Sequence, residues 1–229
     1  MTIPNITFTG IDETTKKSDL LALSHDYPTI EFGLLHSLNW DEKSNRYPNP
    51  KIMESLYDER INYSLHLCGR LARRALVNDY SELYASMGHT LDYFKRMQLN
   101  IGRIKPKPNY HISYPSNMIT QIIIQTSDMA NIELYEQLSK NINCAPLFDA
   151  SGGRGLYTPV SQSIVTYDSK YIGFAGGISI DNCIDVMNTL TSHHNTDTTY
   201  WIDMETSLRD KSDNFSIQRC TEVCQKLFN

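Results

Sequence analysis

The feature that most constrains the fold is a regular alternation of short apolar segments with stretches of helical periodicity. Eight segments rich in Ile, Leu, Phe and Tyr have the length and composition of buried strands. They are residues 3–9, 29–35, 62–68, 96–101, 120–125, 145–150, 171–176 and 199–205. Helices are expected at 17–25, from Asn49-Pro50 onward, once or twice in 71–94, and at 132–140, 181–190 and 215–228.

Eight β-then-α units in 229 residues predict an α/β protein with one closed (β/α)8 TIM barrel of eight parallel strands. No stretch has the composition of a linker, so residues 1–229 are expected to form a single domain. A doubly wound open sheet is the alternative, although such sheets rarely use eight strands with helices so evenly interposed. The unit after the sixth strand has no obvious helix, and residues 102–117 are too irregular for one.

Composition and charge restrict the class of function. A net charge of -5 argues against a general nucleic-acid surface or a membrane surface of anionic lipids, because both require a basic patch. The sequence has neither a basic N-terminal leader pattern nor 18 consecutive apolar residues, so we expect a cytoplasmic protein without a membrane span. The five cysteines are scattered and include no C-x-x-C pair, which predicts free thiols.

Polar residues gather towards the ends of the predicted strands. Parallel strands buried on both faces are normally continuous runs of Val, Ile and Leu, so charged side chains there need a partner or a function. In a TIM barrel the active site lies at the carboxyl ends of the strands. Five residues are therefore candidate catalytic groups, namely Glu31, His66, Asp149, Asp203 and Glu205, and five are candidate ligand contacts, namely Arg70, Gln98, Asn100, Gln125 and Arg209.

Two glycine-rich corners add candidate sites for an anion. Gly176 and Gly177 follow the seventh strand, and Ser179 can cap the next helix. Asp149 directly precedes a Ser-Gly-Gly-Arg-Gly turn, in which Gly152, Gly153 and Arg154 would bring amides and a cation close to a ligand. A carboxyl group and an anion-binding turn would then share one corner of the barrel.

Each candidate also has a purely structural interpretation. Glu31 and Asp203 can pair with interior basic residues, and His66 can be satisfied by a backbone carbonyl. Arg70 and Arg209 can cap helices or pair with surface acids. Gly176 and Gly177 can be required only for the backbone dihedral angles of the turn. A metal site would need ligands at short spacing, but the candidates include only one histidine, so we predict no metal and no cofactor.

Several motifs together resemble phosphoribosylanthranilate isomerase, a small (β/α)8 enzyme of tryptophan synthesis. They are Phe174-Ala-Gly-Gly-Ile-Ser179, Leu147-Phe-Asp-Ala150 followed by Gly152-Gly-Arg-Gly155, and Ile202-Asp-Met-Glu-Thr-Ser207, with Ile6 to Ile11 aligning in outline. The resemblance implies phosphate binding at Gly176, Gly177 and the Thr206-Ser207 turn. It also implies that Asp149 is the general acid.

Two departures from that family bear on the reaction. Thr9 occupies the position of the cysteine that serves as general base, and a neutral hydroxyl cannot replace a thiolate at pH 7 without strong activation. Glu205 stands where the family has a serine and would repel a phosphate unless Arg154 or Arg209 intervenes. We therefore do not expect the parent isomerase reaction.

Three functions remain open on the sequence. The first is an isomerase or lyase that acts on a small anionic metabolite, phosphorylated or sugar-like, with Asp149 opposite Glu31, Asp203 or Glu205 and with His66 as orienting group or proton carrier. The second is a barrel that binds a nucleotide-like or sugar ligand without turnover. The third is a scaffold that binds a partner through Trp40, Tyr47 and residues 105–115. The chain is expected to be a monomer or homodimer.

Overall fold

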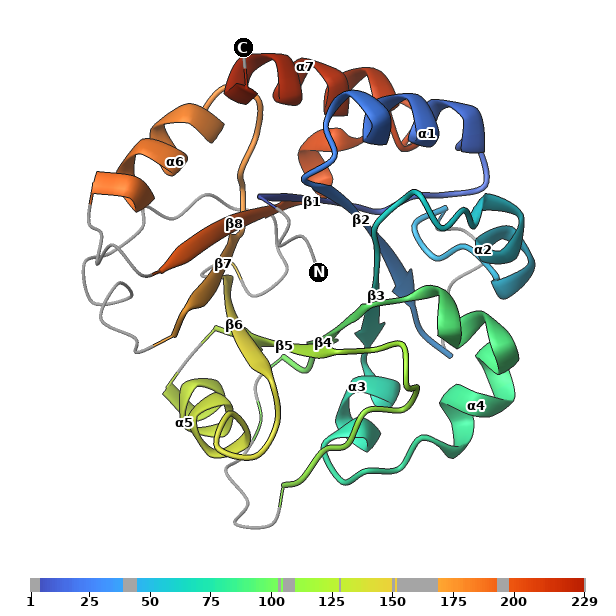
Figure 1. Cartoon of the computed structure of the whole chain (residues 1–229), viewed down its shortest axis with the longest axis vertical. Helices are drawn as coiled ribbons and strands as arrows, with labels where there is room; N and C mark the ends of the chain where they lie inside the picture. The colour runs from blue at the N-terminus through green and yellow to red at the C-terminus, as the bar shows by residue number, and fades with distance from the viewer. Residues whose placement is uncertain are drawn as a thin grey trace.

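The computed structural model describes residues 5–38, 45–102, 104, 110–127, 129–149, 151, 169–192 and 198–228. Eight parallel strands form a closed barrel in which each strand pairs with its neighbour in sequence and β8 pairs with β1 (Figure 1). The strands are β1 (Ile6–Thr9), β2 (Ile30–His36), β3 (Tyr63–Cys68), β4 (Arg96–Asn100), β5 (Gln121–Thr126), β6 (Cys144–Asp149), β7 (Tyr171–Ala175) and β8 (Thr199–Met204). The predicted (β/α)8 fold is therefore confirmed.

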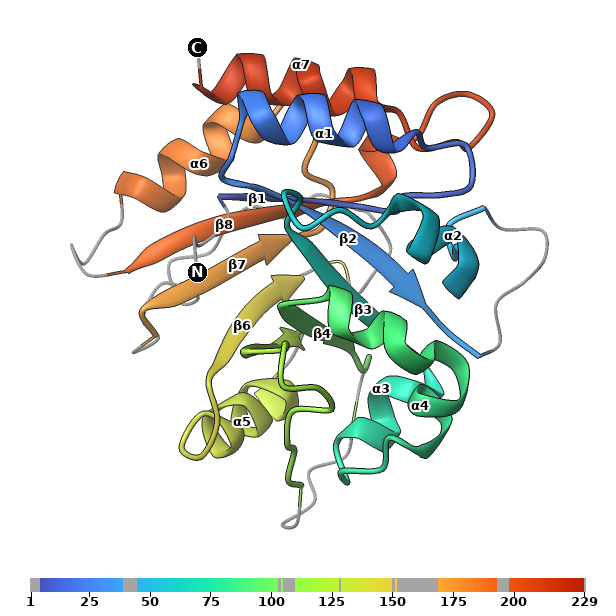
Figure 2. The same ribbon diagram turned by 45° about the vertical axis from the view of Figure 1, so that its right-hand side comes forward.

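The helices surround the barrel, as Figures 1 and 2 show. They are α1 (Lys17–Asp26), α2 (Pro50–Leu56), α3 (Arg70–Ala75), α4 (Ser81–Met87), α5 (Met129–Leu138), α6 (Cys183–Ser192) and α7 (Ile217–Phe228), with short 3-10 helices η1 (Gly88–Tyr93) and η3 (Thr206–Leu208). None of the helices that the structure describes combines the length and the apolar character needed to cross a lipid bilayer.

Local sequence signals account for where two of these helices begin. At α2 the Asn49 side chain accepts a hydrogen bond from the Ile52 amide at 3.1 Å, and Pro50 occupies the first helical turn, where it sacrifices no hydrogen bond. Ahead of α6 the Ser179 amide donates to Asn182 Oδ1 at 2.8 Å, and the Ser179 carbonyl accepts from the Cys183 amide at 2.9 Å. This second cap holds the turn that follows β7.

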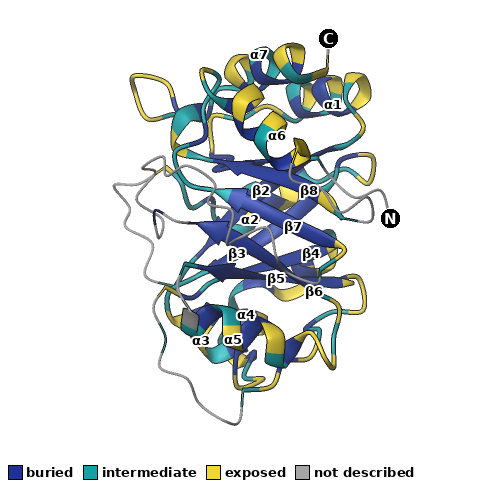
Figure 3. Ribbon diagram, turned by 90° about the vertical axis from the view of Figure 1, so that its left-hand side faces the viewer, coloured by how far each residue is buried: buried dark blue, intermediate teal, exposed yellow. Residues whose placement is uncertain are grey.

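The strands are buried on both faces (Figure 3). Outside the barrel, the apolar side chains of the strands pack against the surrounding helices. Inside it, one side of the interior is a smaller apolar cluster from β5 to β8, made of Ile123, Ala145, Leu147, Tyr171 and Trp201. The barrel is therefore a filled core, as expected for eight strands.

The interior also holds a buried ion pair near the amino ends of β2 and β4. Arg96 Nη1 lies 3.0 Å from Glu31 Oε1, and both side chains are almost fully buried. The Arg96 guanidinium lies 4.6 Å from the ring centroid of Trp201 and 5.2 Å from that of Tyr171. Thr7 Oγ1 donates a further hydrogen bond to Glu31 at 3.0 Å. Glu31 therefore neutralises a cation that the barrel encloses.

This arrangement predicts a strongly non-additive effect on stability. Glu31→Gln leaves the Arg96 guanidinium buried without its carboxylate, so the free energy of unfolding should fall by ~3–5 kcal/mol. The double variant Glu31→Gln/Arg96→Met removes both charges and should lose less than the single variant. Urea denaturation of both proteins measures the difference. The surface pair variant Arg70→Gln serves as the control and should unfold near the wild-type midpoint.

A double variant that loses as much stability as Glu31→Gln, or more, would contradict a coupled buried pair.

Candidate functional site

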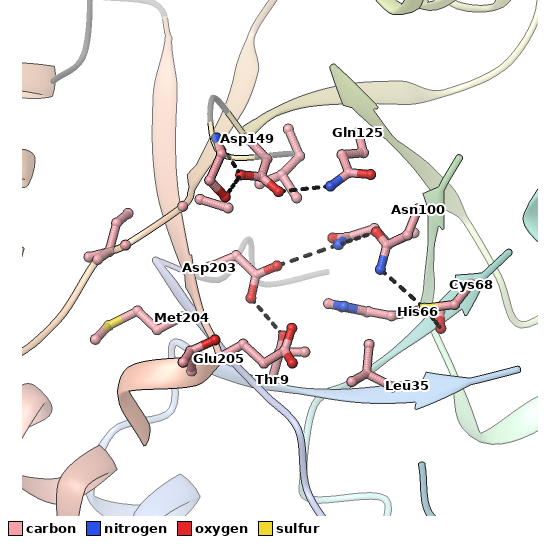
Figure 4. A pocket seen from close by; sticks show the side chains of 18 of the residues that line it. Thr9, Leu35, His66, Cys68, Asn100, Gln125, Asp149, Asp203, Met204 and Glu205 are labelled. Atoms are coloured by element: carbon pink, nitrogen blue, oxygen red, sulfur yellow. Dashed lines mark hydrogen bonds between the residues drawn. The ribbon is translucent and has the colours of Figure 1, made fainter. Parts of the chain in front are cut away.

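A pocket of about 630 Å³ opens at the carboxyl ends of the strands, and residues from all eight strands line it. Nine predicted site residues line it together, namely His66, Gln98, Asn100, Gln125, Asp149, Gly176, Gly177, Asp203 and Glu205. Figure 4 shows the side chains of Asp149, Asp203 and His66 extending into it from different strands. This is the face of a TIM barrel that carries active sites.

Asp203 on β8 is held from two sides. Its carboxyl group accepts hydrogen bonds from Thr9 Oγ1 at 2.6 Å and from Gln98 Nε2 at 3.4 Å. Burial raises the pKa of Asp203 to about 7, with the charges of Glu205 and Glu31 adding to the rise and the two hydrogen bonds opposing it. A carboxyl group with this pKa can give or take a proton near neutral pH.

Thr9 occupies a place that only a glycine on the neighbouring strand leaves open. A Cβ atom at Gly33 would lie 2.4 Å from Thr9 Oγ1 and 2.8 Å from the His66 ring. Thr9 and His66 therefore both use the space above Gly33. The hydroxyl at the position of the family's cysteine donates to Asp203, so it orients a carboxyl group.

Asp149 at the end of β6 is fixed by three donors. Gln125 Nε2 donates to Oδ2 at 2.8 Å, and the Ser151 amide and hydroxyl donate to Oδ1 at 3.0 and 2.6 Å. A Cβ atom at Gly176 would approach Asp149 Oδ1 to 2.8 Å, so the turn after β7 needs glycine to pass this carboxylate. The Asp149 carboxyl group therefore shares its corner of the barrel with the Gly176-Gly177 turn, whereas residues 152–155 of the Ser-Gly-Gly-Arg-Gly turn that the sequence predicts beside it lie outside the described residues.

Two backbone turns border the pocket beside that corner. Gly176 and Gly177 have φ angles of 94° and 66°, which other residues adopt only with strain. Ser207 Oγ donates to the Ile178 carbonyl at 2.7 Å, which joins the turn after β7 to the turn after β8. Within the part of the chain that the structure describes, the amides of Gly177, Ile178, Thr206 and Ser207 donate to no protein acceptor. These amides are candidate donors to an anion.

Arg46 is a basic residue of the pocket that no sequence pattern singled out. Arg46 Nη1 lies 3.0 Å from Glu205 Oε1, and its Nη2 lies 3.0 Å from Asp213 Oδ1. Among the described residues, Arg46 is the cation that pairs with Glu205, whereas Arg209 pairs with Asp12 and Asp213. Arg154, the other cation expected to offset Glu205, lies outside the described residues. The sequence offered one indication of this role for Arg46, namely its position in the loop after the second strand, at the face where TIM barrels bind ligands.

Three predicted site residues lie away from the pocket. Glu31 is enclosed in its ion pair with Arg96. Arg70 is largely exposed and pairs with Glu82 at 2.7 Å. The Arg209 guanidinium is buried against the β1 turn, where it donates to the Gly10 carbonyl at 2.6 Å and to Asp12 Oδ2 at 2.9 Å.

Each of the three side chains pairs with an oppositely charged group outside the pocket, and Arg209 also binds a backbone carbonyl. These contacts agree with a structural role for the three residues.

His66 lies in the pocket, and its ring is uncharged near neutral pH. Burial, with the nearby Arg96 guanidinium, lowers its pKa to about 3. Of the two roles expected for His66, orientation of a ligand is the one compatible with this environment. Cys68, which the sequence analysis did not select, also lines the pocket, and burial raises the pKa of its thiol to about 11. This thiol is therefore a poor nucleophile.

Some expectations fall on parts of the chain that the structure does not describe. Gly152, Gly153, Arg154, Trp40 and residues 105–109 lie outside the described residues. Within the described ranges, no three His, Cys, Asp or Glu side chains converge as a metal site would require.

The raised pKa of Asp203 predicts a pH dependence of stability. The folded pKa exceeds the unfolded value of about 3.9, so the group's contribution is fully present below pH 4 and is lost as the pH rises through 7. Between pH 4 and 8 this group should lower the free energy of unfolding by ~2–4 kcal/mol. Urea denaturation across this range should show that Asp203→Asn removes that dependence, whereas the exposed control Asp185→Asn retains it.

If Asp203→Asn and wild type show parallel pH profiles, the carboxyl group does not titrate as described.

Comparison with known proteins supports the fold. No family model and no curated protein matches the chain. Two structures of phosphoribosylanthranilate isomerase match the chain, each with a TM-score of 0.56 and 13% sequence identity over 98% of both chains. One is a monomeric form from Thermotoga maritima. The other is a complex with reduced 1-(o-carboxyphenylamino)-1-deoxyribulose 5-phosphate. The Thermus thermophilus enzyme matches with a TM-score of 0.51 and 12% identity over 97% of this chain and 98% of its own. At these identities the likeness shows the fold, and the chain is a divergent barrel similar to phosphoribosylanthranilate isomerase.

Proposed function

We propose that the chain is an enzyme that moves a proton within a small anionic metabolite, phosphorylated or sugar-like, as an isomerase or lyase. One observation carries this proposal. Two carboxyl groups from separate strands, Asp149 on β6 and Asp203 on β8, line the same pocket, and one of them titrates near neutral pH. Two carboxyl groups in different environments are the arrangement that acid/base catalysis requires.

The environments suggest a division of roles. Asp203 is partly protonated near pH 7 and is the candidate acid. Asp149 accepts hydrogen bonds on both carboxyl oxygens, from Gln125 and Ser151, and is the candidate base. This reverses the role that the resemblance implied for Asp149. Thr9 donates to Asp203, so it supports the acid and does not replace the missing cysteine as base.

The pocket supports an anionic, hydroxylated ligand. The amides of Gly177, Ile178, Thr206 and Ser207 border one side, and Arg46 supplies a cation near them. Arg46 also offsets Glu205, which removes the repulsion expected between that carboxylate and a phosphate. The amide side chains of Gln98, Asn100 and Gln125 can donate to and accept from sugar hydroxyls.

A barrel that binds without turnover is the second candidate. The observation that favours it is the complete use of both carboxyl groups in hydrogen bonds to neighbouring side chains, which is also how structural carboxylates are held. The two candidates differ in what the carboxyl groups do once a ligand is bound. Only the enzyme requires them to exchange a proton.

Substitution of either carboxyl group separates the two candidates. In a screen of sugar phosphates and related acids for turnover, Asp149→Asn and Asp203→Asn should each lower kcat by ~10²-fold or more, because each removes a proton-transfer group. Ligand affinity should change much less. The control Asp185→Asn, an exposed carboxylate on α6, should match wild type. Ligand binding by the wild type without turnover would favour the binding barrel, and full activity in both variants would contradict the enzyme.

The role of Arg46 can be tested with inorganic phosphate. Arg46→Gln removes the cation and leaves Glu205 unpaired beside the amides, so phosphate affinity should fall about tenfold. Titration calorimetry at low salt measures the dissociation constant. Arg73→Gln, which removes an exposed arginine from α3, is the matched control and should bind as wild type does. Equal affinity in the two variants would place the anion elsewhere.

A further inference from the structure

His66 combines burial in the pocket wall with an unused ring nitrogen. The side chain is 1% exposed and lines the cavity. Figure 4 shows its ring reaching from β3 towards the middle of the cavity, on the side opposite Asp203. Among the residues that the structure describes, none forms a hydrogen bond with His66 Nδ1. A buried polar atom without a partner is costly and needs an explanation.

The other ring nitrogen fixes the position of the proton. Ser64 Oγ lies 2.9 Å from His66 Nε2, and Ser64 is fully buried. In the described part of the chain, the Ser64 side chain has no other hydrogen-bond partner. A proton on Nε2 would leave both the hydroxyl proton of Ser64 and the lone pair of Nδ1 without a partner, whereas a proton on Nδ1 leaves only that N–H group unpaired. We therefore assign the hydroxyl as donor to Nε2 and place the proton of the neutral imidazole on Nδ1. Nδ1 is thus assigned as an N–H donor.

The surroundings keep the ring neutral and fixed. The charged group that acts on the ring is Arg96 on β4, which pairs with Glu31 on β2, and Asp203 on β8 lies across the cavity (Figure 4). Burial and the Arg96 guanidinium both disfavour an imidazolium. On the neighbouring strand β2, the missing Cβ of Gly33 leaves room for the ring edge that carries Nε2. His66 therefore has one orientation and one charge state near neutral pH.

We propose that His66 binds a substrate carbonyl oxygen through its neutral Nδ1–H group, with that oxygen held between the imidazole ring and the carboxyl group of Asp203 across the cavity. This inference rests on the proposed acid/base function and extends it to a substrate class, namely a carbonyl compound whose adjacent carbon carries both a hydrogen and a hydroxyl group. A neutral donor polarises the carbonyl and keeps its own proton, so proton transfer stays with the two carboxyl groups.

The step that follows balances without a further reagent when the adjacent carbon carries a hydroxyl group. Asp149 takes the proton from that carbon, and the electron pair of the broken C–H bond forms the C=C bond. The π pair of the carbonyl moves to its oxygen, which the His66 N–H stabilises and which takes the proton of Asp203. The products are an enediol, a protonated Asp149 and an ionised Asp203. Asp149 then gives its proton to the former carbonyl carbon, where the C=C pair forms the new C–H bond. The hydroxyl of the adjacent carbon becomes the new carbonyl, and its proton passes to Asp203.

Nuclear magnetic resonance of the wild-type chain with ¹⁵N-labelled histidine tests the assignment directly. The expected spectrum has a protonated Nδ1 and an unprotonated Nε2 for His66, with no change from pH 8 to pH 5. Loss of the His66 signals in His66→Asn identifies them. A proton on Nε2, or a titration with a midpoint above pH 6, would overturn the proposal.

The ligand contact is tested with 2-phosphoglycolate, whose carboxylate resembles an enediolate and whose phosphate suits the amide-bordered corner. His66→Asn keeps an N–H donor near the position of Nδ1 and should bind this probe within about threefold of wild type. His66→Gln places its amide near the position of Nε2 and should bind about tenfold more weakly. Thermal unfolding confirms that both variants are folded.

The outcomes distinguish this inference from the function on which it rests. Equal binding by His66→Gln and wild type would overturn the role of His66 while leaving the proposed function intact. A wild-type chain that does not bind 2-phosphoglycolate at millimolar concentration would contradict the anion site of the proposed function. The proton position on His66 would then decide the proposal by itself.

Discussion

Burial of the Asp203 carboxyl group at the mouth of the barrel is the constraint on which the rest of the site depends. A carboxylate removed from water is expensive unless donors or cations compensate, and here two neutral donors do so in part. The remaining cost holds the pKa near neutrality. A more exposed or better compensated aspartate would be ionised throughout the physiological range and could not act as an acid.

Two charge pairs frame this group. Below it, the Glu31–Arg96 pair fills the interior between the polar side of the barrel and the apolar cluster around Trp201. Above it, Arg46 holds Glu205. In both cases the cation offsets a carboxylate that would otherwise raise the pKa of Asp203 further. One pocket therefore holds the uncharged His66 ring, the carboxyl groups of Asp149 and Asp203 in different environments, and the Arg46 cation.

Much of the fold could be predicted because it depends on local periodicity. Seven strands begin and end within one residue of the predicted limits, and β1 starts three residues later than predicted, at Ile6. The candidate site was recovered where chemistry coincided with a strand end, as at Asp149, Asp203 and His66. Barrel geometry brings the carboxyl ends of the strands together, so counting the strands was sufficient to place these three side chains near one another.

The remaining contacts depend on side-chain directions that a single sequence does not contain. Glu31 and Arg209 look like site residues until their partners Arg96 and Asp12 are known, and those partners lie 65 and 197 positions away. Arg46 was missed for the converse reason, because it belongs to a loop whose position follows only from the packed structure. Thr9 and His66 both occupy the space left by the missing side chain of Gly33. The sequence of the β2 strand alone does not reveal this contact.

The central claim is that Asp203 shares its proton with the solvent near neutral pH. Carbon-13 nuclear magnetic resonance of a chain labelled at the aspartate carboxyl carbons measures this directly, with Asp203→Asn identifying the resonance. The account predicts a titration midpoint near pH 7 for that carboxyl group. A midpoint below pH 5 would contradict it, because Asp203 would then be a permanently ionised group that hydrogen bonds merely hold in place.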